Sequence, residues 1–272
     1  MMGPRIALTD PCNSSFLWVP ELAQDSLGSC ALDIRLEGDA VKHVPDVVAA
    51  VRSKATRPLE LRYHFPLGGY DFSAKDAEEA RLGFVGAARA IDGLAEMGGR
   101  FLTVHLPIGW DEVASRLSGA RHRLTELTAY AAEQGVTVCL ENLRGGVTSD
   151  PDVFMGLVDA AGCAVTLDIG HANSSDVAKR GFGSVDFAQM VAPHVRNAHV
   201  YDREDPHHHC PENLDRIGET LEALLKTGCD WWVIELFDRE EVAFTRDLLQ
   251  GFLREHGRPT TLCPVEDEGA LR

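Results

Sequence analysis

The chain has 272 residues, close to the about 250 residues that one (β/α)8 barrel requires. Because hydrophobic residues make up 44% and charged residues 25%, the chain can bury a core, which excludes an intrinsically disordered protein. The formal net charge of −16 disfavours binding to nucleic acid, since phosphate groups are neutralised by a basic surface. A small-molecule partner is favoured instead.

Neither an export signal nor a membrane span is visible in the sequence. No run of about 18 apolar residues occurs, and the first ten residues lack the basic and then apolar pattern of a signal peptide. The seven cysteines are scattered and contain no C-x-x-C pair, so reduced structural thiols are expected. The sequence therefore predicts a cytoplasmic protein without a membrane partner.

Short apolar runs alternate with longer segments of helical period along the whole chain, which is typical of repeated β-α units around a parallel sheet. Strands are predicted at 5–11, 30–38, 59–67, 100–108, 136–144, 164–172, 195–203 and 231–239. Eight strands is the number that a closed barrel needs.

Helices are predicted between these strands, for example over 74–99 and 111–135, and the first one, within 19–29, has no clear boundaries. Glycines are expected to stop several helices shortly before the next strand, at Gly98, Gly135, Gly162 and Gly228. We expect one barrel domain over 1–257 and a tail over 258–272 without periodic pattern.

Six successive predicted strands finish with a histidine or an acidic residue directly after the apolar run. These residues are His64, His105, Glu141, Asp168, His199 and Glu235. A single residue of this kind is more often a surface group than a ligand, but the loops after barrel strands meet at one end. Carboxylates gathered there repel one another unless a cation neutralises them. Oxygen and imidazole ligands suit Mn²⁺, Zn²⁺, Co²⁺ or Mg²⁺.

Four ordered segments carry a resemblance to a known family: CLEN at 139–142, LDIGH at 167–171, NAHVYD at 197–202 and VIEL at 233–236. Together they resemble the xylose isomerase-like barrel superfamily, which includes sugar and sugar-phosphate isomerases and epimerases and the endonuclease IV type of DNA-repair enzyme. The resemblance implies that Glu141, Asp168, His199 and Glu235 bind one divalent metal. In the epimerase branch it further implies that Glu141 and Glu235 exchange protons with the carbon next to the substrate carbonyl.

His171 has two roles in this superfamily, and the sequence leaves both open. It resembles a histidine that binds a substrate hydroxyl in epimerases and a ligand of a third metal in endonucleases. In the endonuclease branch His64 and His105 would join Glu141 around another metal. A D-x-H pattern, offered here by Asp205 and His207, would join His171, although His208 and His209 compete for the histidine role.

Several further residues near the predicted strand ends could contact a substrate. Arg62, Arg144 and Arg203 could bind an anionic group such as phosphate, since guanidinium suits oxyanions. Trp110 could form an apolar wall. The resemblance to epimerases implies an arginine after the seventh strand. Arg203 lies close to that position, but the acidic Asp205 occupies it.

The sequence favours a divalent-metal-dependent isomerase or epimerase of a sugar, sugar phosphate or related hydroxy-carbonyl compound, working through an enediolate. The alternative is a hydrolase with two or three metals that acts on a phosphoester or amide of a small metabolite, for example a corrinoid side chain. A DNA-repair endonuclease is less favoured because the net charge is negative. A binding protein without activity is also less favoured, because many ionisable groups are expected at one place.

Overall fold

Eight parallel strands close into a barrel in the computed structural model, which describes residues 3–9, 31–36, 38–54, 58–66 and 70–258. The prediction of a (β/α)8 barrel is confirmed. Around the barrel the strands follow the order β1, β10, β7, β6, β5, β4, β3, β2. Their bounds are β1 Arg5–Thr9, β2 Ala31–Arg35, β3 Glu60–Phe65, β4 Phe101–Val104, β5 Thr137–Glu141, β6 Ala164–Asp168, β7 Val195–Val200 and β10 Trp231–Ile234.

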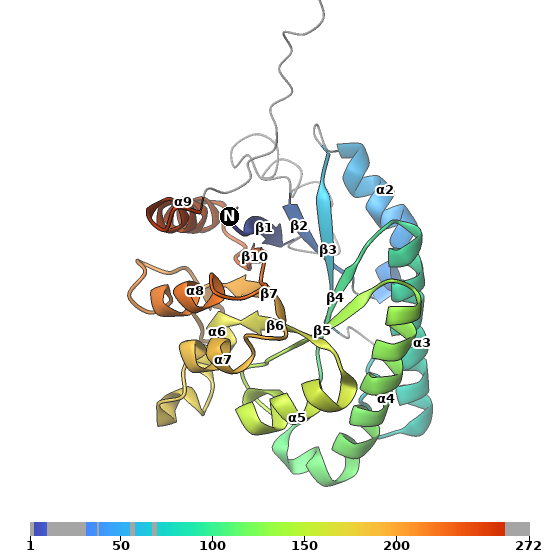
Figure 1. Cartoon of the computed structure of the whole chain (residues 1–272). Helices are drawn as coiled ribbons and strands as arrows, with labels where there is room; N and C mark the ends of the chain where they lie inside the picture. The colour runs from blue at the N-terminus through green and yellow to red at the C-terminus, as the bar shows by residue number, and fades with distance from the viewer. Residues whose placement is uncertain (1–2, 10–30, 37, 55–57, 67–69, 259–272) are drawn as a thin grey trace, which may run out of the picture.

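Helices surround the strands, with α2, α3 and α4 along one side and α6 to α9 along the other (Figure 1). The α-helices are α2 Val44–Lys54, α3 Ala77–Glu96, α4 Val113–Glu133, α5 Pro151–Ala161, α6 Ile169–Ser174, α7 Ser184–Met190, α8 Gly218–Leu224 and α9 Arg239–Glu255. Short 3-10 helices are η2 Gly38–Lys42, η3 Trp110–Glu112, η4 Val147–Ser149 and η5 Ala178–Arg180. The helix expected within 19–29 and the tail from 259 lie outside the described residues.

Local sequence sets the ends of these helices. Asp76 precedes α3, and its side chain accepts hydrogen bonds from the backbone N–H groups of Glu78 and Glu79. Gly98 follows the same helix with φ of 75°, a conformation that glycine adopts without a steric penalty. Gly135 and Gly162 stop α4 and α5 in the same way, but Gly228 is absent from the described glycines with positive φ.

The strands end earlier than the sequence predicts, and β6 shows the reason. The strand predicted over 164–172 ends at Asp168, and α6 begins at the next residue. Asp168 has an extended backbone, and its Oδ1 accepts a hydrogen bond from the backbone N–H of His171 at 2.6 Å. The polar residue that ends the strand therefore also caps the helix, and it turns His171 back toward the barrel.

Side chains alternate along the strands, so one set is buried between the strands and the helices and the other set is buried inside the barrel. Side chains such as Leu32, Ile34 and Phe65 face outward and are buried under the helices. The inner face is polar in the middle of the barrel, where the hydroxyls of Thr103 and Thr166 lie 2.8 Å apart and the side-chain amide of Asn197 contacts both. This buried polar floor leaves the carboxyl end of the barrel as the place for a site.

A small antiparallel hairpin follows β7 at that end, with β8 Arg203–Glu204 and β9 His208–His209. Among the described residues, no helix is both long enough and apolar enough to span a membrane.

Candidate metal centre

Three carboxylates and an imidazole are buried together at the carboxyl ends of β5, β6, β7 and β10. Glu141 ends β5 and Asp168 ends β6, whereas His199 lies late in β7 and Glu235 directly follows β10. All four residues are at most 3% exposed. The structure therefore brings the four predicted ligands to one end of the barrel, although they come from segments almost 100 residues apart in sequence.

His199 is the meeting point of this group. Its Nδ1 lies 3.0 Å from Oε2 of Glu235, 3.5 Å from Oε2 of Glu141 and 3.5 Å from Oδ2 of Asp168. Within the described part of the chain, both oxygens of Glu141, Oδ2 of Asp168 and both ring nitrogens of His199 lack a hydrogen bond of good geometry. Buried polar atoms are normally satisfied, so a convergent set of unsatisfied ligand atoms fits a bound cation.

The directions of the pKa shifts show that this group favours positive charge. Burial alone would lower the pKa of His199, but the carboxylates of Glu235, Glu141 and Asp168 outweigh burial and raise it well above 6.5. Burial alone would raise the pKa of Glu235, yet His199 holds it below its ordinary value. A proton on His199 thus supplies charge that a divalent cation would supply more fully.

A second group shares Glu141 with the first. His64 at the end of β3 and His105 just after β4 place their Nε2 atoms 3.3 Å and 3.2 Å from Oε2 of Glu141, and 2.7 Å from each other. Burial is the main cause that lowers the pKa of His64 well below 6.5, so its ring is neutral and keeps a lone pair for a metal. Oε2 of Glu141 thus lies within 3.5 Å of ring nitrogens from both groups.

His171 points from the first turn of α6 toward the same carboxylates. Its Nδ1 lies 3.4 Å from Oε1 of Glu141 and 3.3 Å from Oδ2 of Asp168, while its Nε2 lies 3.1 Å from Oε2 of Glu204. Burial opposes the charged form, but Asp168, Glu141 and Glu204 raise the pKa of His171 well above 6.5.

The hairpin places other candidate metal ligands near His171 than the sequence predicted. Ligand atoms of Glu204 and His208 group with His171 within 4.8 Å, whereas Asp205 and His207 are exposed and belong to none of the described ligand groups. Glu204 and His208 face each other across β8 and β9, and so point to the same side of the hairpin. Asp205 and His207 lie in the turn between these two strands.

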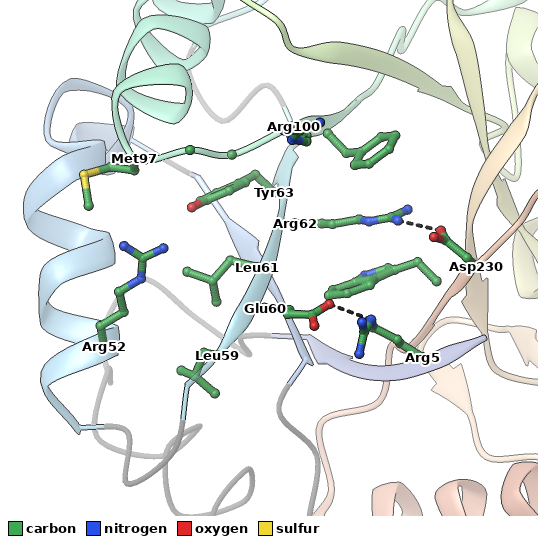
Figure 2. A pocket seen from close by; sticks show the side chains of 14 residues that line it. Arg5, Arg52, Leu59, Glu60, Leu61, Arg62, Tyr63, Met97, Arg100 and Asp230 are labelled. Carbon is green, nitrogen blue, oxygen red and sulfur yellow. Dashed lines mark hydrogen bonds and ion pairs between the residues drawn. The ribbon is translucent and has the colours of Figure 1, made fainter. Parts of the chain in front are cut away.

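Arg62 does not lie where a substrate contact was expected, because it is at the amino end of the barrel. Its guanidinium hydrogen-bonds the carbonyl oxygen of Arg196 at 2.9 Å, the side-chain oxygen of Asn197, and Oδ1 of Asp230 at 2.6 Å. It stacks between the rings of Phe101 and Trp231. Figure 2 shows Arg62 and Asp230 among the residues that line a hollow at the start of β3. Arg62 fills the barrel floor and does not contact a substrate at the other end.

The other expected substrate contacts lie around the rim. Arg144 is 44% exposed and donates to the carbonyl oxygen of Glu204 at 3.2 Å, which places it beside the hairpin. Arg203 pairs with Asp202 at 2.7 Å. Trp110 is 55% exposed in η3 after β4, and no described contact joins it to the metal ligands.

Sequence reasoning missed Arg35, whose Nη1 lies 3.0 Å from Oε1 of Glu235. The signal was present: Asp33 and Arg35 are two polar residues at a spacing of two in an otherwise apolar strand, so both point to the barrel axis.

Comparison with known proteins shows the family of the barrel. Residues 39–256 match the family described as xylose isomerase-like TIM barrel. The chain belongs to this family. An uncharacterized protein of Methanocaldococcus jannaschii is 31% identical over 157 residues, which cover 57% of this chain and 68% of that protein. A second uncharacterized protein of the same organism is 23% identical over 260 residues, 88% of each chain.

Solved structures of this xylose isomerase-like type share the fold. A D-tagatose 3-epimerase-like protein has a TM-score of 0.73 and 20% identity, over 93% of this chain and 98% of that chain. An L-ribulose 3-epimerase has a TM-score of 0.69 and 13% identity, over 93% and 95% of the two chains. At these identities the likeness establishes the barrel architecture.

Proposed function

We propose that this xylose isomerase-like barrel is a divalent-metal-dependent isomerase or epimerase of a sugar, sugar phosphate or related hydroxy-carbonyl compound. One observation carries the proposal: the carboxylates of Glu141 and Glu235 approach His199 from strands that are three places apart in the barrel order. Two carboxylates that enter one site from different sides can serve the two faces of a substrate carbon. The sugar epimerases among the structural relatives support the same class.

Glu141, Asp168 and His199 would hold the metal through the unsatisfied oxygen and nitrogen atoms described above. Glu235 would join them through Oε2, which lies 3.0 Å from Nδ1 of His199. A divalent cation here would polarise a carbonyl and stabilise negative charge on its oxygen. Mn²⁺, Zn²⁺, Co²⁺ and Mg²⁺ are all compatible with this ligand set.

The chain's own groups would carry the proton transfer. One glutamate takes the proton from the carbon beside the carbonyl, which leaves the substrate as an enediolate, and a glutamate returns a proton to complete the isomerisation. Because neighbouring carboxylates raise the pKa of His171, its ring holds a proton that it can donate to a substrate hydroxyl.

A second candidate function, a metal-dependent hydrolase, is favoured by a different observation. His64 and His105 add a group of nitrogen ligands on Glu141, and Glu204 and His208 add another around His171. Several metals in one site are typical of enzymes that hydrolyse phosphoesters or amides. A phosphoester or amide of a small metabolite, such as a corrinoid side chain, fits this reading better than DNA because of the net charge of −16.

Isotope labelling separates the two proposals. Free and phosphorylated ketoses, phosphoesters and amides are first screened with the metal-loaded protein. For an active hydroxy-carbonyl substrate, deuterium on the reacting carbon should produce a primary isotope effect, which reports cleavage of the carbon–hydrogen bond even when the same proton returns. Uptake of ¹⁸O from labelled water with bond cleavage, and no isotope effect, would contradict the isomerase proposal and support the hydrolase.

A further inference from the structure

Asp33 is a buried carboxylate in the middle of the barrel, on the amino side of the proposed metal ligands. It alternates with Arg35 along β2, and because Arg35 reaches Glu235 inside the barrel, Asp33 points to the same interior. Its side chain is 1% exposed. Neither of its oxygens has a hydrogen-bond partner among the residues that the structure describes. An unpartnered buried carboxylate is costly, so a role that offsets this cost is expected.

The polar groups of the barrel floor are engaged elsewhere. Arg62, the register neighbour of Asp33 on β3, directs its guanidinium to Asn197 and Asp230. Thr103 and Thr166 contact each other. Asp33 therefore lies between an occupied floor and the carboxyl end of the barrel.

His199 offers the complementary unsatisfied group. Its Nδ1 faces the three carboxylates, while its Nε2 is buried and, within the described ranges, has no hydrogen-bond partner. Asp33 and His199 are thus two buried residues of the barrel, one with an unpartnered carboxylate and one with an unpartnered ring nitrogen.

We infer that Asp33 is a positioning residue for the metal ligand His199: in the metal-loaded protein its carboxylate accepts a hydrogen bond from Nε2–H through one water. A proton fixed on Nε2 leaves the lone pair of Nδ1 for the metal. A carboxylate behind a ligating histidine fixes the tautomer and ring orientation and increases the basicity of the ligand. The inference rests on the proposed metal site, but not on which reaction that site catalyses.

Metal titration of the stripped full-length protein tests this role with two variants. Asp33→Asn removes the charge at nearly constant shape, and Asp33→Leu removes every acceptor. Both should bind Mn²⁺ and Zn²⁺ about 10- to 100-fold more weakly than the unaltered chain, with the larger loss in Asp33→Leu. Asp46→Asn, which removes an exposed carboxylate on α2, is the matched control and should leave affinity unchanged. Equal affinities for Asp33→Leu and the unaltered chain would overturn the inference.

Nitrogen NMR of the Zn²⁺-loaded protein gives a readout that a merely structural role would not change. His199 of the unaltered chain should carry its proton on Nε2, with a resonance shifted downfield by a water that the Asp33 carboxylate holds, and Asp33→Asn should reduce that shift. If both variants fail to fold, the spectrum of the unaltered chain still tests the inference. A His199 proton on Nδ1, or an Nε2 proton without this downfield shift, would overturn the role of Asp33. Failure of the unaltered chain to bind metal would instead overturn the proposed function.

Discussion

The two ends of the barrel differ in whether their buried charged groups have hydrogen-bond partners. At the amino end, the guanidinium of Arg62 is enclosed by hydrogen-bond acceptors and two aromatic rings. At the carboxyl end, buried atoms of Glu141, Asp168 and His199 converge but have no hydrogen bonds of good geometry within the described residues. The described contacts of Arg62 stabilise the amino end, whereas the carboxyl end presents unsatisfied ligand atoms that the proposed cation would neutralise. On this proposal the same strands carry stability at one end and chemistry at the other.

The largest effect is expected when one ligand at the carboxyl end is changed. Glu235→Gln keeps the shape of the side chain but removes a negative charge from the proposed metal site. Affinity for Mn²⁺ should therefore fall more than about 100-fold, which exceeds the loss typical for residues that contact only a metal ligand. Isothermal titration of the stripped protein measures this, and circular dichroism checks that the fold is kept. Glu240→Gln, on the first turn of α9, is a matched control that should bind metal normally. Full metal occupancy in Glu235→Gln would show that the site is assigned wrongly.

Arg62→Met tests the amino end. It leaves the Arg196 carbonyl and the Asn197 side chain without their donor, so the free energy of unfolding should fall by about 3 kcal/mol while metal affinity stays the same. Urea denaturation compares this variant with Arg100→Met, an exposed arginine of the same hollow, for which a change below about 0.5 kcal/mol is expected. A loss of metal binding without a loss of stability would contradict the division between the two ends.

The eight strands, and the convergence of Glu141, Asp168, His199 and Glu235 at one end of the barrel, were predictable from sequence, because each of these residues directly ends an apolar run and strand ends meet at one place in a barrel. Their role as metal ligands comes from the family resemblance and stays a prediction. Arg62 was misplaced because it lies inside its strand, two residues before His64, and this shift moves a side chain toward the opposite end. The hairpin residues were chosen wrongly because pairing of Glu204 with His208 depends on the register of two-residue strands, which a D-x-H spacing does not contain.

A smaller effect, with a dependence on pH, is expected for Asp33→Asn in the metal-free protein. Burial raises the pKa of Asp33 from 3.8 to about 6 in the folded state, so the folded protein binds the proton more tightly than the unfolded chain. Ionised Asp33 therefore destabilises the fold above pH 6, and this penalty disappears as the pH falls below 3.8. Asp33→Asn should raise the free energy of unfolding by about 1–3 kcal/mol at pH 7.5 and have little effect near pH 4.

Denaturation at several pH values measures this difference, with Asp46→Asn as the exposed control. A variant that is less stable than the unaltered chain at pH 7.5 would show that Asp33 has a stabilising partner in the metal-free protein.

The smallest contrast concerns the hairpin. His208→Gln should weaken binding of a further divalent ion by about tenfold, since His208 groups with His171 and Glu204, whereas His207→Gln should change it less than twofold because His207 is exposed. Titration beyond the first metal equivalent compares the pair. A larger loss in His207→Gln would restore the ligand set expected from the sequence.

Anomalous diffraction from crystals soaked in Mn²⁺ or Zn²⁺ tests the central claim most directly, because it locates the cation without knowledge of the substrate. The account predicts a peak at the carboxyl end of the barrel, bound by Glu141, Asp168, His199 and Glu235, and no peak beside Arg62. A barrel without a peak at that end, or a metal held by other residues while these four side chains turn to contacts within the protein, would contradict it.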